Sequence, residues 1–161
     1  YLIGRTGQII SLFPDRYWAW HLGETAIGGN REMSRTSIGI ELTNWGWFKE
    51  YNGSMWTHNG LQYCSNTQTY LYERNKPFRD QSTWATFTDE QYVSLKKLLT
   101  YLTDKYKIPY TFLPESERLE VTKKATVEKG IFTHVNYRDR NKYGRWDKWD
   151  MGPAFDFSRI E

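Results

Sequence analysis

The stretch Ser37–Leu42, which reads SIGIEL, is the part of the sequence from which the fold can be worked out. Its apolar residues alternate with other residues, a period of two that is typical of a β-strand. Glu41 stands inside this otherwise apolar strand, and its carboxylate must be paired or face a cleft, because burial of a bare charge is unfavourable. We therefore predict a central strand that presents Glu41 as a candidate general base; a sheet-edge carboxylate without a function is the alternative.

The segments before this strand predict a hairpin and a loop. Tyr1–Arg5 and Gln8–Phe13 are short apolar runs on either side of Thr6-Gly7, the pattern of a β-hairpin whose glycine adopts a positive φ. Residues 23–35 contain three glycines and several charged residues, which favours a loop.

The clearest predicted helix follows the strand, from Thr88 to about Tyr106. Thr88 can cap it, Gln91 stands three residues later as in a capping box, and Phe87 can pack against the helix from outside. Pro109 lies just beyond the predicted end. One face is apolar at spacings of three and four residues and should lie on a sheet: Tyr92, Leu95, Leu98, Leu99 and Leu102.

The remaining segments complete an α/β prediction. Residues from about 45 to 85 show no persistent period and predict a long irregular insertion with some short strands. Gly130–Val135 predicts a further strand, and a short last helix should begin at Pro153. We expect one domain over residues 1–161, built as a single mixed β-sheet flanked by helices, with the insertion added to it.

Composition excludes several classes of protein. Apolar residues make up 39% and aromatic residues 17% of the 161 residues, which argues against disorder. The net charge of +3 is spread along the chain, so a nucleic-acid-binding surface is disfavoured. Cys64 is the only cysteine, which excludes an internal disulfide, and no apolar run approaches the roughly 20 residues of a membrane span. Cytoplasmic, secreted and phage-delivered proteins all fit these observations, and no oligomeric state is predicted.

Two polar residues near the end of the chain could bind a metal, and a third could act beside them. His134 lies at the predicted end of a strand, and the following polar loop reaches Asp150; zinc accepts both ligand types. Lys148 should point to the same side of the extended loop as Asp150 and can stabilise an oxyanion. Solvated loop residues are the alternative interpretation for all three.

In combination, these segments resemble the zinc-dependent N-acetylmuramoyl-L-alanine amidases, a superfamily that includes the peptidoglycan recognition proteins. The resemblance covers most of the chain outside the insertion, and its motifs occur in the family's order. They are the hairpin of residues 1–9, the proline-to-histidine segment Pro14–Gly23, the strand Ser37–Leu42, the helix start Thr86–Tyr92, Thr133-His134, and Lys148–Phe157.

The resemblance implies a role for each candidate residue. His134 and Asp150 become zinc ligands, Glu41 the acid/base residue, and Lys148 the group that stabilises the tetrahedral intermediate. His21 would lie beside the substrate, with Trp20 packed beneath it, whereas His58 has no counterpart and is expected on the surface of the insertion. The family's first zinc ligand is a histidine upstream of the hairpin, so we expect an N-terminal segment before Tyr1 to supply it. Met151 replaces the usual proline, and the loop before Lys148 is longer than in compact relatives.

The implied activity is hydrolysis of the amide bond between N-acetylmuramic acid and L-alanine in peptidoglycan or muropeptides, with Zn²⁺ activating a water, as in cell-wall-degrading endolysins. The alternative is a non-catalytic peptidoglycan-binding module of the same fold. The presence of Glu41, Lys148 and Asp150 favours the enzyme, because pure binders tend to lose these groups.

Overall fold

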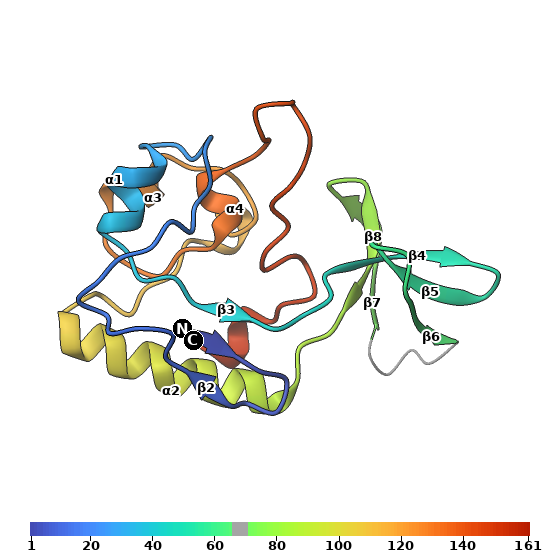
Figure 1. Cartoon of the computed structure of the whole chain (residues 1–161), viewed down its shortest axis with the longest axis horizontal. Coiled ribbons are helices and arrows are strands. Elements are labelled where there is room, and N and C mark those ends of the chain that lie inside the picture. The colour runs from blue at the N-terminus through green and yellow to red at the C-terminus, as the bar shows by residue number, and fades with distance from the viewer. Residues whose placement is uncertain (66–70) are drawn as a thin grey trace.

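The computed structural model describes residues 1–65 and 71–161 and contains a small mixed sheet (Figure 1). This sheet has the order β2-β1-β3, where β1 is Leu2–Ile3, β2 is Ile9–Ile10 and β3 is Glu41–Leu42. β1 pairs with β2 in antiparallel and with β3 in parallel orientation, which confirms the hairpin and the mixed α/β class. The strand predicted from Ser37 is shorter than expected and lies beside the central strand β1 rather than in the centre.

Helix α2 (Asp89–Tyr106) covers one side of this sheet (Figure 1). The predicted capping box is present, since the Thr88 side chain accepts from the Gln91 amide and the Gln91 side chain accepts from the Thr88 amide. The helix ends where Lys107 adopts a left-handed conformation with φ 55°. All five predicted stripe residues are buried and share one core with Ile3 and Leu42, which confirms the prediction for this helix.

Three short helices gather on the other side of the mixed sheet (Figure 1). They are α1 (Asn30–Arg35), α3 (Lys124–Val127) and α4 (His134–Tyr137). The 3₁₀ turns η2 (Glu115–Glu117) and η3 (Phe157–Arg159) complete the helical elements of the described residues.

Three local predictions are wrong. Residues 23–35 contain α1 and are not only a loop. The strand predicted over Gly130–Val135 is reduced to an isolated bridge between Phe112 and Ile131, because Thr133 and Asn136 form a capping box that starts a helix at His134. No helix begins at Pro153; instead Asp156 caps the short turn η3.

The insertion forms a second sheet, which corrects both the irregular structure and the single sheet that we predicted. Its order is β6-β5-β4-β8-β7, with every neighbouring pair antiparallel. It has its own small core around Phe48, Met55 and Ala85, and it stands to one side of the rest of the chain (Figure 1). Its strands are β4 (Trp47–Tyr51), β5 (Ser54–Thr57), β6 (Gln62–Ser65), β7 (Leu71–Phe78) and β8 (Gln81–Ala85).

One sequence feature indicates part of this sheet, the Asn-Gly pair at residues 52–53. Asn52 and Gly53 connect β4 to β5 with φ values of 50° and 69°, as in the two-residue turns that favour Asn-Gly. Among the described residues, none of the helices combines the length and the apolar character needed to cross a lipid bilayer.

Candidate active site

The fold brings His134 and Asp150 together, as the sequence predicted. His134 is the first residue of α4, and the loop after this helix returns so that the Val135 amide donates to the Asp150 carbonyl at 3.3 Å. The side chains meet as well, with His134 Nδ1 3.2 Å from Asp150 Oδ2. A backbone contact and a side-chain contact thus fix the two predicted ligands relative to each other.

The tautomer of His134 follows from the hydrogen-bond partner of its second ring nitrogen, Nε2. His134 Nε2 is hydrogen-bonded to the backbone carbonyl of His21. A carbonyl oxygen only accepts, so Nε2 must carry a proton and donate it. In a neutral imidazole, Nδ1 then presents a lone pair to the Asp150 carboxylate, and two acceptors would face each other. Nδ1 and the Asp150 carboxylate therefore offer two neighbouring donor atoms to a cation.

This donor pair fits a zinc ion in part. Metal-bound histidines commonly donate their other ring N–H to a backbone carbonyl, which is what His134 does with His21. Catalytic zinc usually has three protein ligands and an open position. Within residues 1–65 and 71–161, no group of three His, Cys, Asp or Glu side chains is arranged to hold a metal. His134 and Asp150 therefore match two of the three ligands.

Asp150 has the charge state that such a pair requires. Burial works to raise the pKa of its carboxyl, but the hydrogen bond with His134 and the charges of His134 and Lys148 outweigh burial and lower the pKa below its usual value. Its side chain is still 53% exposed. Asp150 is consequently an ionised carboxylate at neutral pH, able to balance a cation.

Glu41 faces this pair from the mixed sheet. Leu42 and its partner Ile3 are buried toward α2, and because side chains alternate along a strand, Glu41 points to the opposite side. Its carboxyl group reaches solvent, yet removal of water by surrounding protein atoms raises its pKa, and the charge of Asp150 raises it further. A carboxyl group with a raised pKa is suited to take up and release a proton.

Lys148 supplies a cation to the same region. Its charge lowers the pKa of both Glu41 and Asp150, and at Glu41 it opposes the effects of burial and of the Asp150 charge. The four predicted residues His134, Asp150, Glu41 and Lys148 therefore lie within electrostatic range of one another, although they come from a strand, a helix and a loop.

His21 and Trp20 are placed differently from the expectation. His21 Nδ1 lies 2.8 Å from the Ala19 carbonyl and Nε2 lies 3.0 Å from Ser37 Oγ, so both ring nitrogens already have partners in the protein. The His21 backbone carbonyl accepts the hydrogen bond from His134, and the two imidazole rings lie 6.4 Å apart. Trp20 is not packed beneath His21, since 60% of it is exposed and its ring meets that of Trp18 edge-on at 5.2 Å.

Sequence reasoning missed the contacts that the insertion makes with this site. The Arg79 guanidinium donates to the Lys148 backbone carbonyl, and the Trp47 ring lies 5.9 Å from that of Trp149. No local pattern marks Arg79, because its partners lie far away in the sequence. His58 is exposed in the insertion, as predicted.

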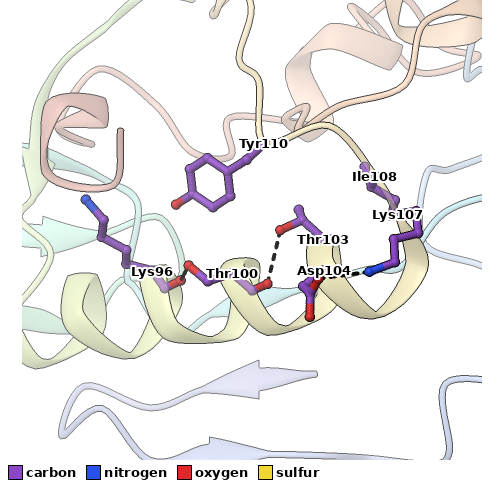
Figure 2. Close-up of a pocket in the computed structure, with 7 residues that line it drawn as sticks. All are labelled: Lys96, Thr100, Thr103, Asp104, Lys107, Ile108 and Tyr110. Atoms are coloured by element: carbon purple, nitrogen blue, oxygen red, sulfur yellow. Dashed lines mark hydrogen bonds and ion pairs between the residues drawn. The ribbon is translucent and has the colours of Figure 1, made fainter.

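A hollow on the surface of α2 is not part of this site. It has a volume of about 490 Å³ and lies between α2 and the segment that follows it (Figure 2). Its polar groups are already engaged: Tyr110 donates to the Ile160 carbonyl at 2.5 Å, and Lys107 pairs with Asp104 at 3.0 Å. It contains none of the predicted site residues.

Comparison with known proteins gives a family match over nearly the whole chain. A family model described as N-acetylmuramoyl-L-alanine amidase matches residues 1–153. The chain is also 48% identical over 42 residues to the N-acetylmuramoyl-L-alanine amidase AmiD of Escherichia coli (strain K12), which covers 26% of this chain and 15% of that relative. No solved structure gives a significant match. The family match spans the mixed sheet, α2 and all four clustered residues, and the chain therefore belongs to the N-acetylmuramoyl-L-alanine amidase family.

Proposed function

We propose that this chain is the catalytic domain of a zinc-dependent amidase that cleaves the bond between N-acetylmuramic acid and L-alanine in peptidoglycan or muropeptides. The main support for this proposal is that the charges of Lys148, His134 and Asp150 all act on Glu41, while His134 contacts Asp150 directly. The family description and the name of the E. coli relative support this bond as the target.

His134 and Asp150 would hold the zinc ion together with a third ligand outside the described residues. When bound, zinc supplies Lewis-acid polarisation of a carbonyl and a lowered pKa for water. The hydrogen bond from His134 Nε2 to the His21 carbonyl keeps Nδ1 free for the metal and fixes the orientation of the ring.

Glu41 would transfer protons, and Lys148 would stabilise negative charge. Glu41 takes a proton from the attacking water while the water oxygen bonds to the lactyl carbonyl carbon. The Lys148 ammonium group balances the negative charge that develops on the carbonyl oxygen. Glu41 then gives its proton to the nitrogen of L-alanine as the C–N bond breaks, so the products are a free lactyl carboxylate and a peptide with a free amine.

Trp20 is the proposed substrate contact beside this cluster, because its exposed ring offers an apolar face to a sugar or peptide. His21 would assist through its position next to His134 rather than through a free ring nitrogen. Trp20→Ala should raise KM for muropeptide with little change in kcat, and an unchanged KM would rule out this role.

A non-catalytic wall-binding module is the second candidate, because the described residues supply only two metal ligands. The raised pKa of Glu41 favours the enzyme, since a binder has no use for a carboxyl group suited to proton transfer.

The decisive variant is Glu41→Gln, which removes the proton carrier and keeps the size of the side chain. We expect amine release from a purified muropeptide to fall by about 10²- to 10⁴-fold, with unchanged zinc content and melting temperature. Glu90→Gln, at an exposed position of α2, is the matched control and should retain full activity. Retention of near-normal activity by Glu41→Gln would overturn its acid/base role.

A further inference from the structure

The loop that carries Lys148 and Asp150 contacts the insertion at three points. The Trp47 and Trp149 rings lie 5.9 Å apart. Gly152 has φ 69°, and a Cβ atom on it would come within 2.9 Å of the Trp84 ring, so the backbone after Asp150 passes directly over β8. The β7–β8 turn makes the third contact through Arg79.

Arg79 occupies an unusual place for a charged residue. It lies in the turn between β7 and β8, and it and Asp80 both have positive φ values, 50° and 65°. Residues other than glycine rarely adopt this conformation, and hairpin turns of this kind usually carry small residues that face solvent. The Arg79 side chain is nevertheless only 6% exposed. A buried guanidinium group requires partners, because leaving it unpaired is strongly unfavourable.

The partners of Arg79 come from both ends of one loop. At the start of the loop, its guanidinium donates to the Arg138 carbonyl at 3.4 Å and lies 3.6 Å from Asp139. At the end, it donates to the Lys148 carbonyl and stacks over the Trp146 ring at 4.9 Å. The planar fork of N–H groups in arginine suits such bridging, whereas lysine is a single point donor.

We propose that Arg79 is a positioning residue that holds the loop of residues 138–148 closed and thereby places Lys148 opposite Glu41. This inference rests on the proposed amidase function and assigns a role to the insertion: it supports the catalytic loop. Arg79 acts through Lys148, because only 6% of its own side chain is exposed, too little to contact a substrate.

The test uses the full-length protein with Arg79→Gln, Arg79→Lys and the control Arg145→Gln, an exposed arginine of the same loop. Displacement of a catalytic group by about 1 Å through a remote mutation can lower the rate by about 100-fold. We expect Arg79→Gln to lower kcat by this factor with little change in KM, because Lys148 acts on the transition state. Arg79→Lys keeps the charge but not the fork, so it should lower kcat without lowering the melting temperature. Arg145→Gln should match the wild type.

A double-mutant cycle separates positioning from a general structural effect. If Arg79 acts through Lys148, Arg79→Gln should add little loss of kcat to Lys148→Met, whereas independent effects would multiply. Amide hydrogen exchange should also become faster in residues 138–150 of Arg79→Gln while α2 stays protected. A wild-type kcat in both Arg79 variants, multiplying losses, or unchanged exchange in the loop would each overturn the inference. A wild-type protein that releases no amine would instead overturn the proposed function, and this inference with it.

Discussion

The two sheets of this protein support the site in different ways. The mixed sheet shares its core with α2, and Ile3 and Leu42 anchor the strand that presents Glu41. The five-stranded sheet has a separate core around Phe48 and Met55, and it contacts the loop that carries Lys148 and Asp150. Glu41, the proposed acid/base residue, thus lies on the main core, whereas the loop with Lys148 and Asp150 contacts the added sheet. Mutations in the core of the mixed sheet should therefore destabilise the whole chain, whereas mutations in the core of the five-stranded sheet should mainly destabilise the insertion.

The largest effect is expected for Phe48→Ala in the insertion core, where Phe48 is 3% exposed and stacks on Tyr63 at 4.5 Å. Truncation of a buried phenylalanine removes about 3–5 kcal/mol of stability. We expect the loss to appear as faster amide exchange in β4, β5 and β8, while α2 keeps its protection. The exposed Tyr51→Ala on β4 is the control. Equal loss of protection in α2 would show that the two cores unfold as one.

The matching change in the main core is Leu99→Ala, at a buried position of α2. A cavity of this kind should lower the free energy of unfolding of the whole chain by about 2–5 kcal/mol, measured by urea denaturation. Val93→Ala on the same helix is the control, since Val93 is 52% exposed. A Leu99→Ala protein as stable as the control would contradict the view that this core holds the fold together.

The smallest change in stability is expected at Thr88, which links the N-terminal hairpin to α2 by hydrogen bonds. Thr88 Oγ1 donates to the Arg5 carbonyl at 2.7 Å and accepts from the Gln91 amide at 3.2 Å. Thr88→Ala should destabilise the protein by about 1 kcal/mol, and Thr88→Ser, which keeps the hydroxyl, should recover most of it. Failure of the serine variant to recover stability would assign the effect to the lost methyl group instead of the cap.

These regions also differ in how far the sequence predicts them. Helix α2 was predictable because its cap, its stripe and its end are signals within about 20 residues of one another. The pairing of His134 with Asp150 was also predicted. The helix that begins at His134 was not, although Thr133 and Asn136 form a capping box at its start. Strands such as β7 and β8 obtain their stability from partners across the sheet, so local periodicity does not reveal them.

Arg79 marks the limit of sequence reasoning in this protein. Its partners at residues 138–148 are about 60 or more positions away, as for the contact with Arg138, and its own surroundings read only as a turn. Only the three-dimensional arrangement shows that the insertion contacts the loop that carries Lys148 and Asp150.

We propose that the His134–Asp150 pair is part of a zinc site that supports amide hydrolysis. The most direct measurement is amine release from purified muropeptide by the full-length protein, together with elemental analysis, before and after chelation and after zinc is added back. We expect one zinc per chain, loss of amine release on chelation and recovery of release when zinc is added back. Full release from a metal-free protein, or a zinc-loaded protein that binds the wall and releases no amine, would contradict this proposal.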